Sequence, residues 1–456
     1  MTNHGSLEPH KTDGPSSFLP LLTFLLVYLG SGIFFTVLGV ENPFKQISRE
    51  FSILCGICVL LLLGRNVRGI NRNVDVFIDG CADPNSLLIL AIYVTAGAFS
   101  GAAKGMGAVD STVGLCMTFV PPQLAVAGVF LVSSLLATAL GSSMTTIATL
   151  GPVALGIAEQ TGASTAIAIA AVLGGAMFGD NLSIISDTTI AATKSCGCEM
   201  NDKFKMNFLI ALPAAILSLI LYAVFGSAGV AEQNYTYSII KILPYIVVFV
   251  TALLGWNVIL VLVFGTALCG FIGFATGAWN LPGFSLAVTK GIGGMLSIAV
   301  QALLIRGMSA FVREFGGLEW LLNKIRKWIH SRRSAEYGIS AVVGMIDVAM
   351  GNNTIAILVS APLAMKFARI YNIAPKRVAS LLDIFACVVQ SFIPNGGQMM
   401  LCMSLTALSP FAIIQAAYYP WLLGIAALLT IQFGLLRTKE EKEGKDLFAG
   451  IPEEKI

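Results

Sequence analysis

Charged side chains are scarce in this chain: Asp, Glu, Lys and Arg make up 12% of the 456 residues, against about 25% in soluble globular proteins. Three stretches contain none of them, namely Ser111–Ala158, Met206–Ala231 and Ile242–Thr289. Each is longer than the roughly 20 residues that cross a bilayer core. With 56% hydrophobic residues, this scarcity excludes a soluble enzyme, a nucleic-acid-binding protein, a disordered chain and a secreted disulfide scaffold. The sequence predicts an all-α polytopic membrane protein.

The chain also has few groups that could carry enzymatic chemistry or ATP hydrolysis. Its three histidines, His4, His10 and His330, are predicted outside the membrane, and no Walker motif is present. Most of the nine cysteines lie in apolar runs, where a free thiol packs as a small hydrophobe. We therefore expect neither an enzyme nor a bound cofactor, and an ion gradient is the predicted energy source. The first apolar run, 18–40, is long enough to span, so no cleavable signal is expected.

Ten apolar runs are predicted to cross the membrane: 18–40, 50–64, 87–104, 163–194, 206–226, 241–255, 258–276, 288–304, 375–402 and 409–434. Two further segments, 122–161 and 336–371, are interrupted at their middles by small polar residues, and each predicts a re-entrant hairpin. If the N-terminus lies inside, 23 of the 28 basic residues fall on the cytoplasmic side. This asymmetry predicts a multi-pass protein of the cell (inner) membrane with both termini in the cytoplasm.

The two halves of the chain repeat the same order of segments. The first repeat covers residues 18–226, with hairpin 122–161 and a broken helix at 163–194. The second covers 241–435, with hairpin 336–371 and a broken helix at 375–402. Each half also has a short amphipathic stretch, at 108–119 and 308–329. A polar segment, 1–17, and a charged tail, 436–456, are predicted in the cytoplasm. Five crossings per half require opposite orientations, and such inverted repeats are typical of secondary transporters.

Four polar clusters interrupt the predicted membrane segments, two at hairpin tips and two at helix breaks. The tips hold Ser142, Ser143, Thr145, Asn352, Asn353 and Thr354, the second break holds Asn395 and Gln398, and the first break holds Asp180, Asn181, Ser183, Ser186, Asp187 and Thr188. Unwound backbone at membrane depth exposes carbonyl oxygens, which together with these side chains suit Na⁺. The half-helix N-termini favour a bound anion instead, such as a substrate carboxylate.

Four acidic residues are predicted within the membrane. Asp180 and Asp187 are seven residues apart, about two helical turns, which would place them near one face. Ionised carboxylates there would bind a cation and protonated ones would release it, although Asp187 would also suit a helix cap. Asp347 and Asp383 are candidate proton carriers, with helix packing or a buried ion pair as the alternatives. A carboxylate in the hydrocarbon zone is costly without a function.

The segment Phe178–Thr189 resembles the Phe-Gly-Asp-x-x-Ser-x-x-Ser-Asp-Thr-Thr signature of the NhaC-type Na⁺/H⁺ antiporters, part of the wider ion-transporter superfamily. The resemblance implies coupling to Na⁺, with Na⁺ at Asp180, Ser183 and Asp187, and with Ser186 and Thr188 as further matching positions. Many members have a basic residue and Pro within the motif, where this chain has Asn181 and Ile184. Because the family also contains carboxylate exchangers and suspected amino-acid carriers, this departure bears on the substrate.

The sequence thus predicts a secondary active transporter that exchanges cytoplasmic Na⁺ for external H⁺ by alternating access. The alternative is a Na⁺-coupled transporter or exchanger of a small carboxylate or amino acid, which the many amide side chains favour. The predicted partners are Na⁺, H⁺ and membrane lipid, with the small organic solute under the alternative and no nucleic acid. A homodimer is a possible assembly.

Overall fold

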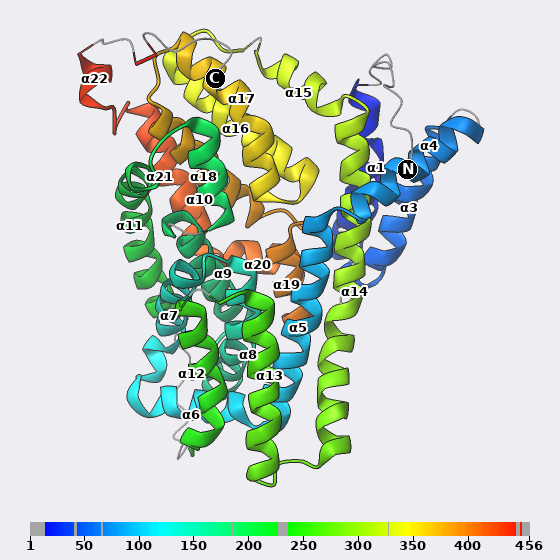
Figure 1. Ribbon diagram of the computed structural model, residues 1–456, viewed down its shortest axis with the longest axis vertical. Helices are drawn as coiled ribbons and strands as arrows, with labels where there is room; N and C mark the ends of the chain where they lie inside the picture. The colour runs from blue at the N-terminus through cyan, green and yellow to red at the C-terminus, as the bar shows by residue number, and fades with distance from the viewer. Residues whose placement is uncertain are drawn as a thin grey trace. The chain divides into compact units, whose positions relative to one another are not determined.

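The computed structural model describes residues 14–40, 43–64, 67–183, 186–226, 236–254, 256–326, 328–443 and 447–448. Positions 1–13 of the predicted N-terminal segment and most of the predicted tail beyond Glu443 lie outside the described residues. Within these ranges the chain is helical and has no strand. The chain divides into two compact units, described separately below. Figure 1 labels the helices and colours them from the N-terminus to the C-terminus.

The first unit comprises residues 1–88, 300–329 and 349–351. Its helices are η1 (Gly14–Phe18), α1 (Leu19–Leu25), η2 (Leu26–Gly30), α2 (Ser31–Val37), η3 (Pro43–Lys45), α3 (Arg49–Leu62), α4 (Val67–Cys81) and α15 (Gly317–Arg326). The segments η1 to α2 follow one another without a gap and form one apolar span, Gly14–Val37. Three helices have residues in both units, namely α5 (Pro84–Met106), α14 (Leu281–Glu314) and α16 (Arg332–Met350).

The second unit comprises residues 89–299, 330–348 and 352–456. Its helices are α6 (Ala108–Phe119), η4 (Pro122–Leu124), α7 (Ala125–Leu140), α8 (Ser143–Thr161), α9 (Thr165–Leu182), α10 (Asp187–Cys196), α11 (Met200–Phe225), α12 (Ile239–Leu253), α13 (Val258–Ala275), α17 (Asn353–Ile370), α18 (Pro375–Gln390), α19 (Gly397–Thr406), α20 (Pro410–Ala416), α21 (Tyr418–Gln432) and α22 (Lys439–Lys442). Helix α9 is its core: it packs against α7 and α8 and also contacts α11, α18 and α19. Its residues from Ala168 to Met177 are almost wholly buried.

Among the described residues, six helical segments are long and apolar enough to cross a membrane, or up to eight if each of two sharply bent helix pairs is one span. The chain is therefore a multi-pass membrane protein. The prediction of ten crossings includes segments that form shorter helices in the structure, such as α3 and α18. The predicted crossing 409–434 is divided into α20 and α21 at Ala417. The predicted amphipathic stretch 308–329 also differs, because α14 continues through Glu314 before α15 begins.

Small polar residues and glycines set the helix ends near the core. Ser142 and Ser186 cap α8 and α10 by accepting hydrogen bonds from backbone N–H groups three residues later, and Asn352 caps α17 in the same way. Gly141 ends α7 in the left-handed conformation, with φ of +62°, which favours glycine. The α7–α8 pair therefore turns within two residues, and α8 begins beside the end of α7.

Close contact between α9 and α7 depends on the absence of a side chain at Gly179. A Cβ atom added there would overlap Ala137 of α7, including its backbone, whereas one added at Gly128 of α7 would meet open space. We expect Gly179→Ala to reduce the free energy of unfolding by about 1–3 kcal/mol through overpacking. Gly128→Ala is the matched control and should preserve or raise stability, because alanine favours helix. Thermal unfolding in detergent tests this, and equal melting temperatures for the two variants would contradict it.

Candidate functional site

The break between α9 and α10 is held together by its own hydroxyl groups. Helix α9 ends at Leu182, Ser183 is extended, and α10 begins at Asp187. The Ser186 hydroxyl donates to the backbone oxygen of Asp180 over 3.0 Å, and the Thr189 hydroxyl donates to that of Ser183 over 2.7 Å. Two backbone oxygens at the end of α9 are thus bound by hydroxyl groups at the beginning of α10.

Asp180 belongs to α9, and its side chain lies at the N-terminus of α8. Its side chain is buried, and Oδ1 accepts a hydrogen bond from the backbone N–H of Ser143 at 3.0 Å. Ser143 is the first residue of α8, whose unpaired N–H groups carry partial positive charge. The predicted hairpin tip and the predicted first break therefore meet here. No basic side chain forms an ion pair with Asp180 in the part of the chain that the structure describes.

Two glutamine side chains connect the second break to this carboxyl group. Gln390 ends α18 and donates from Nε2 to Oε1 of Gln398 in α19 over 2.7 Å. Gln398 in turn donates from Nε2 to Oγ of Ser143 over 3.0 Å. Because Ser143 Oγ accepts this bond, its own hydrogen stays available for Asp180. Gln398 was a predicted site residue; the sequence did not identify Gln390, although it lies beside the predicted break.

The other predicted tip and break residues have local roles. Thr145 Oγ1 lies 2.9 Å from Ser142 Oγ in the first tip. In α17, Asn353 Oδ1 accepts from the backbone of Thr354 at 3.0 Å, while Asn353 Nδ2 has no hydrogen-bond partner among the described residues. Asn395, in the second break, donates from Nδ2 to the backbone oxygen of Val348 in α16 over 3.2 Å. The second break thus contacts the helix that carries Asp347.

Lys203 is a buried residue that the sequence did not identify as part of the candidate site. It lies in the first turns of α11 with its side chain 1% exposed. Its Nζ donates to the backbone oxygen of Asn181 over 2.9 Å and to Thr189 Oγ1 over 2.6 Å. It also forms an ion pair with Asp383 Oδ2 at 2.7 Å. The ammonium group therefore joins both sides of the first break to α18.

Asp383 forms the buried ion pair that was one of its predicted alternatives. Its carboxylate is fully buried, and Asn207 of α11 also donates to Oδ2, over 2.8 Å. A second basic residue, Arg377, is buried as well and pairs with Glu336 at 2.8 Å. Both cations lie near the beginnings of predicted crossings, 206–226 and 375–402, where the sequence alone does not distinguish a buried position from an exposed one.

Asp347 and Asp187 differ in burial. Asp347 is fully buried in α16, and neither carboxyl oxygen has a hydrogen-bond partner among the described residues. Asp187 is exposed at the first position of α10. The predicted common helical face for Asp180 and Asp187 was wrong, because the break falls between them.

Asn181 and Thr188 complete the predicted set. Asn181 is fully buried, with Nδ2 donating to the backbone oxygen of Met177 over 2.9 Å and with its own backbone oxygen bound by Lys203. Thr188 is buried beside the Ser186 hydroxyl, their oxygens 3.2 Å apart. The arrangement brings carboxylate, hydroxyl and amide groups together around an interrupted helix, a combination suited to a dehydrated cation or a proton.

Comparison with known proteins identifies a family. The model of the Na⁺/H⁺ antiporter family matches residues 17–227 and 231–436. The chain is 25% identical over 427 residues to the Na⁺/H⁺ antiporter NhaC of Alkalihalophilus pseudofirmus, covering 85% of this chain and 90% of the relative. It is 24% identical to the malate-2H⁺/Na⁺-lactate antiporter of Bacillus subtilis, covering 46% and 44%. It is 26% identical to the arginine/ornithine antiporter ArcD of Halobacterium salinarum, covering 56% and 54%.

Proposed function

Since the chain belongs to the Na⁺/H⁺ antiporter family, we propose that it exchanges cytoplasmic Na⁺ for external H⁺ by alternating access. The family is one of transporters, and Na⁺ and H⁺ are the ions that its description names. The proposal places the protein in the cell (inner) membrane with both termini in the cytoplasm. It makes Asp180 the group that binds the two ions in turn.

The position of Asp180 is the observation that carries this proposal. A buried carboxylate needs charge compensation, and the N-terminus of α8 supplies only a partial positive charge. The nearby ammonium of Lys203 is already paired with Asp383. The negative charge of Asp180 is therefore compensated by a mobile ion, either Na⁺ or H⁺. Because both bind the same carboxylate, binding of one excludes the other, which is the requirement for exchange.

The proposed Na⁺ site is Asp180 together with oxygens of Ser183 and Asp187 across the break. Ser143, at the tip of the α7–α8 pair, lies against the same carboxyl group. Asp347 is proposed as a second proton carrier, because it is buried without a hydrogen-bond partner among the described residues. The ion pair with Lys203 makes a structural role the better proposal for Asp383.

Two inverted repeats are the proposed basis of alternating access, and the helix bounds support them. Helices α8, α10 and α11 begin at Ser143, Asp187 and Met200, and α17, α19 and α20 begin at Asn353, Gly397 and Pro410, so the offset between the halves is the same for all three pairs. The tip glycines Gly141 and Gly351 have φ of +62° and +59°. Pro152 inside α8 and Pro362 inside α17 are related by that same offset. We propose that the hairpins and broken helices move against the remaining helices.

A Na⁺-coupled exchanger of a small carboxylate or amino acid is the second candidate. Two of the relatives are named for organic solutes. Asn353 Nδ2 and Asn395 Oδ1 are buried amide atoms with no hydrogen-bond partner among the described residues, and such atoms could bind a polar solute. A bare Na⁺ site does not need them.

Ion flux into vesicles separates the two candidates. We expect protein reconstituted in vesicles with an internal pH-sensitive dye to move protons when NaCl is added, with no organic solute present, and to show no response to choline chloride. The physical reason is the competition of Na⁺ and H⁺ for Asp180. Absence of Na⁺-dependent proton flux, together with Na⁺-dependent uptake of radiolabelled malate, lactate or arginine, would replace the proposal by the second candidate.

A further inference from the structure

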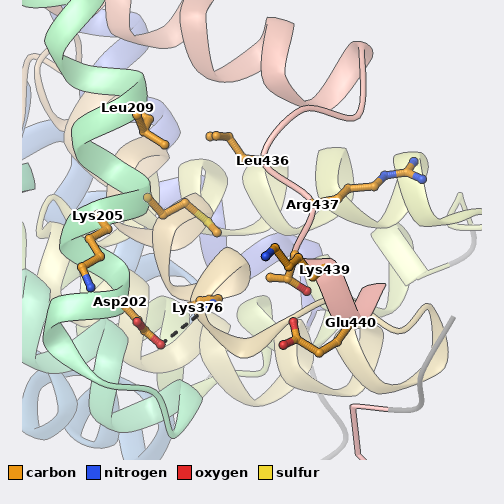
Figure 2. Close-up of a pocket in the computed structure, with 10 residues that line it drawn as sticks. Asp202, Lys205, Leu209, Lys376, Leu436, Arg437, Lys439 and Glu440 are labelled. Carbon is orange, nitrogen blue, oxygen red and sulfur yellow. Dashed lines mark ion pairs between the residues drawn. The ribbon is translucent and has the colours of Figure 1, made fainter. Parts of the chain in front are cut away.

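A pocket of about 430 Å³ shares no lining residue with the candidate ion site and has no part in the proposed exchange. One wall is the beginning of α11, with Asp202, Lys205, Met206 and Leu209, and Lys376 of α18 lies beside it. The opposite wall is the segment from Leu436 to Glu440, which follows α21 (Figure 2). We propose that this pocket binds the headgroup and upper acyl chain of an anionic phospholipid.

The charges of the pocket favour a phosphate group. Lys205, Lys376, Arg437 and Lys439 outnumber its two carboxylates, Asp202 and Glu440. Lys376 is 3.6 Å from Asp202, and both side chains are partly exposed, so this ion pair is weak and yields readily to a competing anion. Lys205 and Lys439 form no ion pair within the described ranges. Arg437 extends away from the other side chains in Figure 2, which leaves the three lysines as the main cations of the pocket.

The apolar part of the pocket favours a lipid over a soluble phosphate. Met206, Leu209 and Leu436 line it beside the charged groups, and Leu209 is 59% exposed. Leu209 and Leu436 lie together at one end in Figure 2. Such an apolar surface matches the first methylene groups of an acyl chain.

The place of the pocket along α11 is the boundary between polar and apolar sequence. Helix α11 has Asp202, Lys203 and Lys205 near its beginning and no charged residue from Met206 to its end at Phe225. It is one of the helices long and apolar enough to span a membrane. Basic residues at the start of such a helix lie at the level of the lipid headgroups.

The wall formed by the tail is fixed to the rest of the second unit. Glu441 accepts hydrogen bonds from the backbone N–H of Ala374 over 2.6 Å and from that of Thr438 over 2.6 Å. It also pairs with Arg332 at 2.8 Å. The tail segment that forms this wall is therefore anchored before a ligand arrives.

Titration of the purified protein in neutral detergent with dioctanoyl phosphatidylglycerol tests the proposal. We expect saturable binding to the unmodified protein and about twenty-five-fold weaker binding to the Lys205→Gln/Lys439→Gln variant, because each basic residue near a membrane contributes roughly fivefold. Lys366→Gln is the matched control, since Lys366 is exposed and outside the pocket. Gel filtration and circular dichroism verify that each variant is folded.

Three further probes identify the source of the phosphate chemistry. Dioctanoyl phosphatidylcholine, inorganic phosphate and glycerophosphoglycerol without acyl chains should all bind much more weakly than dioctanoyl phosphatidylglycerol. Equal binding of phosphatidylcholine, or equal binding of either soluble phosphate, would overturn the assignment to an anionic phospholipid. Unchanged binding by the folded double variant would overturn the assignment to this pocket. None of these binding measurements depends on transport, so their outcome is independent of the test of Na⁺/H⁺ exchange.

Discussion

Asp180→Asn is expected to abolish Na⁺-driven proton flux in reconstituted vesicles. Loss of one charge about 4 Å from a cation costs about 4 kcal/mol at an effective dielectric constant of 20, which weakens Na⁺ binding about a thousandfold. Asparagine also cannot exchange a proton. Its side-chain oxygen can still accept the hydrogen bond from Ser143, so the variant should fold and the loss should be confined to transport.

Asp110→Asn is the control for this substitution, because Asp110 is an exposed carboxylate in the first turn of α6. Its flux should equal that of the unmodified protein. A second measurement is the pH dependence of transport by the unmodified protein. The apparent KM for Na⁺ should rise as pH falls, since protons compete for the same carboxylate. Full activity of a folded Asp180→Asn variant would show that this carboxylate has only a structural role.

The second large effect is expected at the buried pair of Lys203 and Asp383. Lys203→Met leaves the Asp383 carboxylate in the interior without its counter-ion, at a cost of about 3–5 kcal/mol in the free energy of unfolding. The same change frees the backbone oxygen of Asn181 and the hydroxyl of Thr189, which loosens the first break. Denaturation in mixed detergent micelles, followed by circular dichroism, measures the loss.

Removing both charges separates the ion pair from simple packing. The Lys203→Met/Asp383→Leu variant should recover much of the stability lost in Lys203→Met, because no uncompensated charge then remains buried. Glu314→Gln is the control: Glu314 is half exposed and 3.5 Å from Arg72, and such pairs contribute about 0–1 kcal/mol. A double variant no more stable than Lys203→Met would contradict this account of the pair.

Local sequence signals identified the interruptions of the helices but not the contacts between them. Gly141 and Ser142 predict a turn from their own conformational and capping preferences, and the structure has that turn. The polar run after Gly179 similarly marks the end of α9. These features depend on residues close in sequence, so a single chain is sufficient to predict them.

Long-range electrostatics could not be predicted in the same way. Lys203 lies at the edge of an apolar run, where the positive-inside rule assigns a loop, and its partner Asp383 belongs to the other half of the chain. The predicted common face of Asp180 and Asp187 was wrong for a different reason, because a seven-residue spacing implies a common face only in an unbroken helix. Gln390 gave no signal by itself, because its role depends on Gln398 and Ser143 lying beside it.

The hydrogen bonds from Gln390 through Gln398 to Ser143 form a series in which every donor group points in the same direction. Each donor in the series points toward Asp180, so the dipoles around the carboxyl group are oriented for negative charge before any ion arrives. If Na⁺ and H⁺ bind Asp180 in turn, as proposed, their exchange requires little rotation of these side chains. In the proposed exchange, little reorganisation energy is therefore spent at the candidate ion site, and we expect the slower movement of the helices to set the turnover rate.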